Sequence, residues 1–337
     1  MVKVGVIGLG MMGLTHLDAY AKNKNVKIAA ICDSDPARLS GTAHAAGNIE
    51  GQAQSTISEL IDVERCSDAF DVIGNSNIDL VDVCLPTDMH VKFGCEVLRA
   101  GQHLMIEKPL ARTAADARII AEVAQESKGI AFVGHCMRFW PGWTWLKEAV
   151  DDQRFGKVYG ATFRRVVNHP GGPFYSDGDR SGGAALDLHI HDTDFVQFCF
   201  GIPKAVTSFG YSKITNQPDH IISRYEYDDV PLVMAEGSWA MTDGFIFNMG
   251  YTVNFENATA VYDSAQSKPL TLFEKGKNAV QVEVDEIMGY NLEIDYLVDC
   301  ILNGNRPTVV TMEDAMETVR IVEAEIESVQ TGARVAL

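Results

Sequence analysis

The chain opens with Val2-Lys3-Val4-Gly5-Val6-Ile7-Gly8-Leu9-Gly10-Met11-Met12-Gly13-Leu14-Thr15-His16-Leu17. Its first residues alternate and are rich in valine, which predicts a β-strand, and the residues from Leu14 onward have the spacing of an amphipathic helix. Gly8, Gly10 and Gly13 form G-x-G-x-x-G between the two. In a dinucleotide-binding turn the first glycine makes the bend, the second admits the pyrophosphate and the third lets the helix lie close to the strand. The pyrophosphate would then contact the amides at the helix N-terminus.

A second strand is predicted over 27–32, and it ends at Asp33. An acid about twenty residues after the glycine motif accepts hydrogen bonds from the adenosine ribose in such folds. A glycine turn alone occurs in many α/β proteins, but this whole succession of elements indicates a dinucleotide site. We expect NAD rather than NADP, because Asp33 would repel a 2′-phosphate. Arg38 could reach such a phosphate or be a solvated helix charge, and Ser34 stands where some NADP users carry arginine.

Length and composition narrow the function classes. The 337 residues are enough for two domains with a sizeable core. A formal net charge of −18 disfavours nucleic acid and anionic membranes as partners. Without an apolar run of membrane-spanning length or a signal peptide before the first strand, we expect a cytoplasmic protein. The seven cysteines are scattered and include no C-x-x-C pair, which favours reduced, packed thiols.

Strands and helices alternate up to Gly134, which predicts a Rossmann-type domain over 1–134 with a doubly wound parallel sheet. The predicted strands are 27–32, 78–85, 102–106 and 129–134, after the opening one. The predicted helices are 15–23, 36–46, 88–100 and 113–127, with a helical turn over 66–74. Residues 47–62 are interpreted as an inserted surface segment.

From His135 the composition changes to an aromatic-rich run that introduces a helix to about residue 152. The predicted strands that follow are 158–167, 205–211, 221–227, 232–240, 245–255, 258–262 and 280–284. The predicted helices are 184–200, 290–303 and 312–331. The pattern predicts an α+β domain over 135–337 with a large, mostly antiparallel open sheet, which we expect to bind substrate and mediate oligomerisation.

Glu107-Lys108-Pro109 follows the predicted strand 102–106. Ligands of open parallel sheets bind outside the carboxyl ends of the strands, so Lys108 is expected beside the nicotinamide. Pro109 fixes φ and ends the strand. Taken by itself, Lys108 could equally be an ordinary surface lysine.

A second candidate stretch runs from Ser181 to Asp194, where two glycines introduce a helix. Asp187, His191 and Asp194 are spaced i, i+4 and i+7, which places them on one helix face. A histidine beside a carboxylate can accept a proton near neutral pH. The alternative is that these acids and histidines are capping and surface groups. His189 and His191 point to different sides of a helix, so we expect no metal site there.

Together these motifs resemble the Gfo/Idh/MocA oxidoreductase family, which includes glucose–fructose oxidoreductase and the inositol dehydrogenases. The motifs that carry the resemblance are Gly8–Gly13 with His16, Pro86-Thr87 with His90, Glu107-Lys108-Pro109, and Gly182-Gly183 followed by Asp187-x-x-x-His191-Asp192. The resemblance covers nearly the whole chain, including 290–296 and the closing helix. The chain departs from the family pattern by the extra segment 47–62 and by His189, at a position where small or apolar residues are usual. We expect His189 to reshape the substrate pocket.

The resemblance implies how the three catalytic candidates act. His191 would take the proton of a substrate hydroxyl while hydride leaves the same carbon for nicotinamide C4. Lys108 would hydrogen-bond that oxygen, stabilise alkoxide charge and share in proton transfer. Asp187 would bind a neighbouring hydroxyl and tune the Lys108/His191 pair. The open sheet face of the second domain would form the interface of a homodimer or homotetramer.

Candidate ligand contacts come from both lines of reasoning. The candidates for cofactor binding are Gly8, Leu9, Gly10, Met11, Met12, Gly13, Asp33, Ser34, Arg38, Leu85, Pro86, Thr87, His90, Glu107, Lys108 and Arg138. The candidates for substrate binding are Lys108, His169, Arg180, Asp187 and His191. His169, Tyr175 and Arg180 lie in a loop rich in glycine and proline over 168–181, which could cover the pocket or merely form a rigid turn. Trp140, Trp143 and Trp145 are more typical of core packing than of a sugar platform.

The expected function is hydride transfer between NAD and a secondary alcohol or carbonyl of a small sugar, polyol or cyclitol. Three alternatives remain open: glycoside cleavage through transient oxidation, reduction of a non-sugar carbonyl or imine, and an NAD-responsive regulatory protein without catalysis. The presence of Lys108, Asp187 and His191 argues against the regulator, because a pure binding protein needs no proton acceptor beside the nicotinamide.

Overall fold

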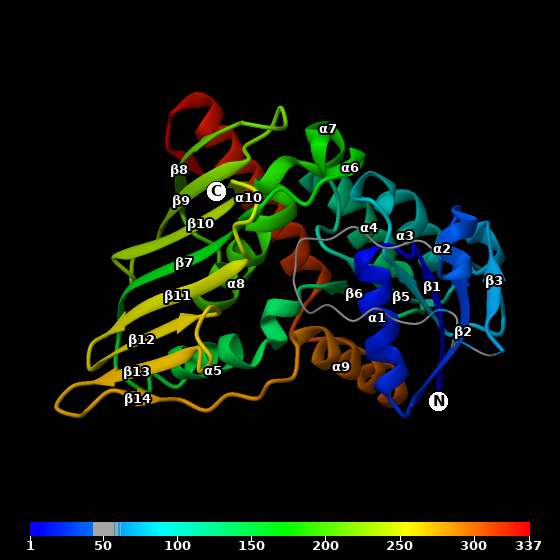
Figure 1. Cartoon of the computed structure of the whole chain (residues 1–337), viewed down its shortest axis with the longest axis horizontal. Coiled ribbons are helices and arrows are strands. Elements are labelled where there is room, and N and C mark those ends of the chain that lie inside the picture. The colour runs from blue at the N-terminus through cyan, green and yellow to red at the C-terminus, as the bar shows by residue number, and fades with distance from the viewer. Residues whose placement is uncertain (43–56, 58–59, 61) are drawn as a thin grey trace. The chain divides into compact units, whose positions relative to one another are not determined.

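The computed structural model describes residues 1–42, 57, 60 and 62–337, and the chain divides into two compact units (Figure 1). Unit 1 comprises Met1–Cys136 and Gly289–Met316, and unit 2 comprises Met137–Met288 and Glu317–Leu337. The predicted functional division at 134/135 stays a prediction. The packing differs from it in one respect, because Gly289–Met316 belongs with unit 1.

Unit 1 contains a six-stranded parallel sheet in the order β3-β2-β1-β4-β5-β6. The strands are β1 Val2–Ile7, β2 Val26–Cys32, β3 Glu64–Cys66, β4 Leu80–Val83, β5 His103–Glu107 and β6 Ala131–Gly134. The order reverses between β1 and β4, the position at which dinucleotides bind in this topology. The predicted doubly wound sheet is therefore confirmed.

Helices and short helical turns connect these strands. They are α1 Met11–Lys22, α2 Pro36–Ser40, η2 Ala69–Asp71, η3 Thr87–Met89, α3 His90–Arg99 and α4 Ala114–Glu126. The turn η4 Cys136–Phe139 follows β6 and, apart from Cys136, belongs to unit 2. The α4 helix begins after Thr113, whose side chain caps it by accepting the Asp116 N–H. Much later in the chain, α9 Gly289–Asn303 returns to unit 1 and packs on α1.

One predicted helix in this unit was wrong in its bounds, and one strand was not predicted. The helix predicted over 36–46 ends at Ser40, because Gly41 adopts a left-handed conformation with φ 75° and its N–H caps the preceding carbonyls. The predicted positions 43–46 and nearly all of the segment 47–62 lie outside the described residues. The strand β3 was not predicted, since it is only three residues long and pairs with β2 alone.

Unit 2 contains a nine-stranded sheet in the order β14-β13-β12-β11-β7-β10-β9-β8-β15. The strands are β7 Val158–Asn168, β8 Ala205–Tyr211, β9 His220–Glu226, β10 Leu232–Met241, β11 Asn248–Phe255, β12 Ala258–Asp263, β13 Leu270–Glu274, β14 Val280–Gln281 and β15 Val335–Ala336. Neighbours are antiparallel except β7 and β10, which are parallel. The mostly antiparallel open sheet is confirmed, although the short strands β13 and β15 were not predicted.

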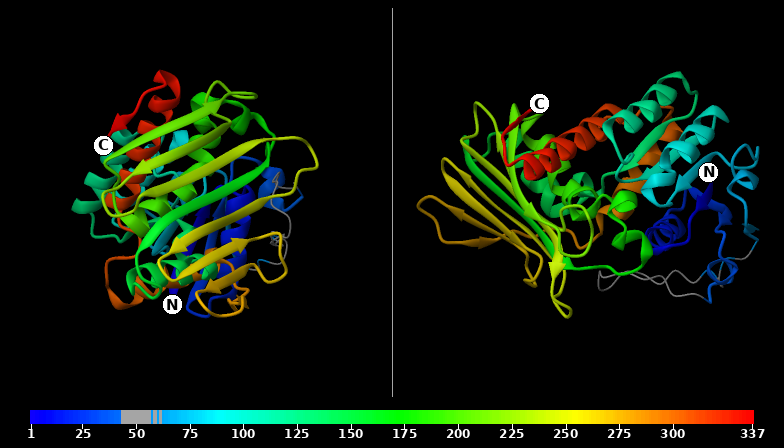
Figure 2. Two further views of the ribbon diagram at one scale, coloured as in Figure 1. Left: turned by 90° about the vertical axis from the view of Figure 1, so that its left-hand side faces the viewer. Right: turned by 90° about the horizontal axis from the view of Figure 1, so that it is seen from above.

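Helices pack against one face of this sheet. They are α5 Pro141–Asp151, α6 Pro173–Ser176, α7 Gly178–Ser181, a π-turn η5 Ala185–His189, α8 Ile190–Phe200 and α10 Met312–Thr331, which begins in unit 1. The α8 helix contacts β7 and β10, and the left-hand view of Figure 2 shows the opposite face of the sheet. In the core, the fully buried Trp143 packs edge-on against Phe195, Tyr251 and Tyr262, as expected for a packing tryptophan.

The helix predicted over 184–200 begins as the π-turn, whose turn is wider than that of an α-helix. Its last residue, His189, lies directly against Gly237 of β10, where an added Cβ would be 2.5 Å from the His189 Cβ. The glycine is therefore needed for this close approach.

Among the described residues, no helix is both long enough and apolar enough to cross a bilayer.

Candidate active site

The glycine turn has the geometry that a pyrophosphate requires. Gly8 has φ 94°, and a Cβ on it would lie 2.4 Å from the Cys84 carbonyl oxygen. A Cβ on Gly13 would lie 1.9 Å from the Gly8 carbonyl oxygen, so this glycine lets α1 pack close to the turn. A Cβ on Gly10 would meet no described atom within 4 Å, and no side chain caps α1 there. The approach to the amides at the start of α1 is thus open on the side where the cofactor is expected.

Asp33 is fixed beside this turn. Its Oδ2 accepts the Leu9 N–H at 2.8 Å, and its Oδ1 accepts the Asp35 N–H at 2.9 Å. Each carboxylate oxygen keeps a second lone pair for a ribose hydroxyl. Arg38 approaches the same carboxylate with an Nη1 to Oδ2 distance of 3.5 Å, while Ser34 is exposed. This arrangement is consistent with the predicted ribose contact, which stays a prediction.

The loops after β4 and β5 are connected through His90. Its Nε2 lies 2.9 Å from the Leu85 carbonyl oxygen, and its Nδ1 lies 2.8 Å from the Pro109 carbonyl oxygen. Burial lowers the pKa of His90, so the neutral ring donates to one of these carbonyls. His90 is buried and stabilises the two loops, whereas Leu85 and Pro86 are half-buried at the predicted cofactor edge and Thr87 is buried.

The Glu107-Lys108-Pro109 turn lies at the carboxyl end of β5, as predicted. The Lys108 N–H donates to Glu107 Oε2 at 3.0 Å, the Lys108–Pro109 bond is cis, and Lys108 is half-buried. Burial alone would raise the pKa of Glu107, but the neighbouring His16 imidazolium and Lys108 ammonium hold it below its ordinary value. Glu107 is therefore a buried carboxylate at the edge of the site.

His16 connects this turn to the helix that follows the glycine motif. Its Nδ1 lies 2.8 Å from Asp82 Oδ2, and its Nε2 lies 3.1 Å from Glu107 Oε1. Burial alone would lower the pKa of His16, but the Asp82 carboxylate raises it well above the ordinary value. Cys84 Sγ donates to Asp82 Oδ1 at 3.3 Å. Although the side chains of His16, Asp82 and Cys84 lie within 4.8 Å of one another, these hydrogen bonds explain the arrangement without a metal ion.

Asp187 and His191 belong to unit 2, and Lys108 belongs to unit 1. Asp187 lies in the π-turn and His191 in the first turn of α8, and both are half-buried. The convergence of these three side chains on one substrate stays a prediction.

Asp194, predicted on the same helix face, has a different role. It is buried, and it accepts two hydrogen bonds from Arg138, from Nε at 2.9 Å and from Nη2 at 2.7 Å. The Arg138 guanidinium also lies over the Phe198 ring at 4.6 Å. The charge of Arg138 is therefore balanced within unit 2, and its predicted contact with the cofactor stays a prediction.

The remaining substrate candidates lie near the short helices α6 and α7. His169 Nδ1 accepts the Gly171 N–H at 3.0 Å, and its ring packs edge-on against Trp239. His169 Nε2 is buried and has no hydrogen-bond partner among the described residues. The guanidinium of Arg180, on α7, lies 5.6 Å from the centre of the Phe174 ring. Their contacts with substrate stay predictions.

His189 is placed differently from our expectation that it reshapes the pocket. It is fully buried beneath the π-turn, with Nε2 3.3 Å from the Tyr225 hydroxyl and 3.5 Å from Glu325 Oε2. Thr193 contacts the same Glu325 carboxylate. His189 thus anchors the helix that carries Asp187 and His191 rather than lining a surface.

Two buried polar groups were not predicted from the sequence, the one around His16 and the one around His189. The available signals were an acid, Asp82, inside a strand pattern that is otherwise apolar, and a histidine three residues after Gly13. Glu293 of α9 interacts electrostatically with the first group, but neither of its carboxyl oxygens has a hydrogen-bond partner among the described residues. It is fully buried, and burial raises its pKa well above the ordinary value. The ionised groups around His16 would be costly to bury unpaired, so their contacts with one another mark a polar network.

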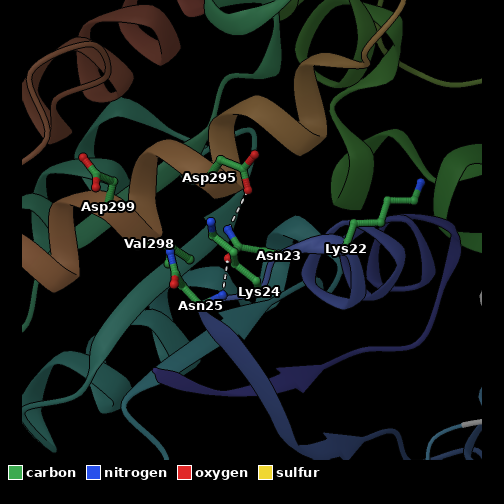
Figure 3. A pocket seen from close by; sticks show the side chains of 7 residues that line it. All are labelled: Lys22, Asn23, Lys24, Asn25, Asp295, Val298 and Asp299. Atoms are coloured by element: carbon green, nitrogen blue, oxygen red, sulfur yellow. Dashed lines mark hydrogen bonds between the residues drawn. The ribbon is translucent and has the colours of Figure 1, made fainter.

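A surface pocket lies at the other end of α1 (Figure 3). Its lining residues are Lys22, Asn23, Lys24, Asn25, Asp295, Val298 and Asp299. Asn23 Nδ2 donates to Asp295 Oδ1 at 2.6 Å, which joins α1 to α9. The pocket is about 18 Å along the helix from the glycine turn, so it is not part of the predicted dinucleotide site.

Comparison with known proteins shows which family models and relatives the chain matches. Residues 2–135 match the family model described as "Oxidoreductase family, NAD-binding Rossmann fold", and residues 147–337 match "Oxidoreductase family, C-terminal alpha/beta domain". Inositol 2-dehydrogenase of Rhizobium meliloti (strain 1021) is 29% identical over 238 residues, which is 70% of this chain and 66% of the relative. The scyllo-inositol 2-dehydrogenase (NAD(+)) of Bacillus subtilis (strain 168) is 25% identical over 353 residues, covering 100% of this chain and 96% of the relative.

Solved structures show the same fold. Levoglucosan dehydrogenase in complex with NADH and levoglucosan superposes with a TM-score of 0.85 at 16% identity, covering 99% of each chain. The WlbA dehydrogenase of Bordetella pertussis, in complex with NADH and UDP-GlcNAcA, has a TM-score of 0.84 at 18% identity, covering 100% of this chain and 97% of the other. Unit 1 is accordingly an NAD-binding Rossmann unit.

Proposed function

The chain belongs to the Gfo/Idh/MocA oxidoreductase family, and from that premise we propose that it transfers a hydride between nicotinamide C4 and a secondary alcohol or carbonyl carbon of a sugar, polyol or cyclitol. The relatives named above as inositol and levoglucosan dehydrogenases support this substrate class. The single observation that carries the proposal is that the glycine turn after β1 and the Lys108 turn after β5 lie at the carboxyl edge of one parallel sheet.

The cofactor fits the residues of unit 1. Open amides at Gly10 and the N-terminus of α1 would hold the pyrophosphate, and the Asp33 carboxylate would accept from the ribose. NAD supplies the hydride acceptor when it is bound. We also propose NAD in preference to NADP, because the exposed Arg38 already lies near the Asp33 carboxylate instead of being unopposed for a 2′-phosphate.

Each of the three candidate catalytic side chains would have a different role toward the substrate. Lys108 would hydrogen-bond the reacting oxygen and stabilise negative charge on it. His191 would accept the hydroxyl proton as the carbon loses its hydride, which balances the oxidation. Asp187 would bind a neighbouring hydroxyl and so fix which carbon reacts.

Assembly and location are part of the proposal. Large apolar side chains are exposed on the strands of the nine-stranded sheet, and such a surface favours association of copies into a homodimer or homotetramer. The exposed residues are Tyr159, Phe209, Tyr211, Leu232 and Phe273. All seven cysteines are free thiols, which supports a reducing compartment, the cytoplasm.

A substrate panel tests the proposed reaction. The purified chain and NAD are incubated with inositols, glucosides, anhydrosugars and polyols, and the nicotinamide absorbance is followed. We expect NADH to form with at least one compound. Release of a free sugar without net NADH would instead indicate glycoside cleavage through transient oxidation. Tight NAD binding without turnover of any compound would favour the regulatory protein.

A further inference from the structure

A buried set of ionisable groups in unit 1 surrounds His16. The histidine is on α1, one turn after Gly13, and its ring lies between carboxylates at the ends of two neighbouring strands. Asp82 of β4 is 2.8 Å from Nδ1, and Glu107 of β5 is 3.1 Å from Nε2. The second contact is an ion pair without hydrogen-bond geometry. Two carboxylates this close to one buried ring favour its protonated form, the imidazolium.

Glu107, which contacts His16, is itself part of the turn that carries Lys108. The oxygen that does not face His16, Oε2, accepts the Lys108 N–H at 3.0 Å. Gly134 of β6 leaves space for this carboxylate, since a Cβ there would be 3.2 Å from Glu107 Oε1. Both oxygens of Glu107 therefore have assigned partners, and its side chain is confined to one arrangement.

We propose that His16 is a positioning residue for Lys108: it holds Glu107 in place, and Glu107 fixes the backbone from which the Lys108 ammonium reaches the substrate. This inference rests on the proposed role of Lys108 in hydride transfer. Since His16 is on the helix whose N-terminus would contact the pyrophosphate, the same contact joins the cofactor helix to the turn that carries Lys108.

The other groups around the His16 ring are consistent with its positive charge. Those that contact it or interact with it electrostatically are Asp82, Cys84, Glu107, Tyr290 and Glu293. Tyr20, on the same helix, interacts with Asp82, Cys84 and Glu293. Burial raises the pKa of the Cys84 thiol and of the Glu293 carboxyl, so both are neutral near pH 7. The imidazolium is consequently opposed by the two carboxylates that touch it.

The kinetic test compares His16→Gln, Glu107→Gln and the double variant with a matched control, His103→Gln. His103 is at the opposite end of β5, where its Nδ1 accepts the Ile130 N–H. We expect His16→Gln to lower kcat about 100-fold, as for a misplaced catalytic group, while the Kd for NAD changes less than about threefold. The double variant should be no slower than the slower single variant, because both changes break one contact. The control should keep wild-type kcat.

A second measurement does not depend on turnover. In the ¹⁵N NMR spectrum of the cofactor-free chain at pH 7.5, the His16 ring, assigned by its loss in His16→Gln, should carry protons on both nitrogens. A neutral ring, or rate effects that add in the double variant, would overturn the positioning role. If the wild type turned over no compound while His16 was doubly protonated, the proposed reaction would fail, and with it the role of Lys108, while the ion pairs would stand.

Discussion

Replacing Gly10 with alanine separates cofactor binding from folding, because the added methyl meets no described atom within 4 Å. Gly10 has φ −76° and ψ −165°, which alanine adopts without strain. Restricting the unfolded chain contributes about 0.4–1 kcal/mol of stability, and a poorer helix cap costs about the same. The free energy of unfolding should therefore change by less than about 1 kcal/mol.

NAD binding should respond differently. The new methyl would occupy the space above the amides that receive the pyrophosphate, and losing a charged hydrogen bond there costs about 1.5–3 kcal/mol. That corresponds to a Kd for NAD raised about 10- to 100-fold, measurable by calorimetric titration. A thermal melt of the same sample reports stability.

Gly13→Ala is the matched comparison. Its Cβ would lie 1.9 Å from the Gly8 carbonyl oxygen, a backbone atom that cannot move aside. Overpacking of this kind costs about 3 kcal/mol or more and should lower the Tm by at least about 5 °C. A Gly10→Ala protein that binds NAD as tightly as the wild type would refute the placement of the pyrophosphate at this turn.

Three further predictions concern ionisable side chains. Lys108→Ala and His191→Ala should each abolish turnover in the nicotinamide absorbance assay. The Kd for NAD should stay within about threefold of wild type, since neither residue is expected to contact the pyrophosphate. Near-normal turnover in either variant would contradict the mechanism. Asp33→Ala should weaken NAD binding about tenfold and reduce the preference for NAD over NADP, measured by titration with both cofactors. An unchanged preference would show that Asp33 does not discriminate between the two cofactors. The pKa of His16 is raised on folding, so its stabilising contribution is complete below the unfolded value near 6.5 and is lost as the pH rises through the folded value. The Tm difference between wild type and His16→Gln should thus be larger at pH 6 than at pH 9, and a difference that grows with pH would contradict the imidazolium.

Regular patterns made the fold predictable. Alternating apolar residues and the glycine motif gave β1, α1 and β2, and alternation placed most strands of unit 2 within one to three residues. The helix end at Gly41 was missed because a left-handed glycine has no signature beyond its identity. The π-turn was missed because helical spacing does not report how His189 packs against Gly237 of a distant strand.

The candidate site was predictable only where a functional side chain lies at the end of a strand. Lys108 after β5 and Asp33 after β2 could be placed from local pattern, since strand ends define the ligand edge of a parallel sheet. The ion pairs of His16 with Asp82 and Glu107 join positions that are 66 and 91 residues away in the chain, and no local pattern predicts such pairing. The pairing of Arg138 with Asp194 was hidden for the same reason.

The return of α9 to unit 1 limits how the protein can be divided. A fragment that stopped at residue 136 would lack Ile294, Leu297 and Val298, which are buried in the intact chain, and would expose the side of α1 against which α9 packs. Such a fragment would be prone to aggregate. A chimera that borrows this nucleotide-binding half must therefore carry two separate pieces of the gene, the second of them coding for residues 289–316.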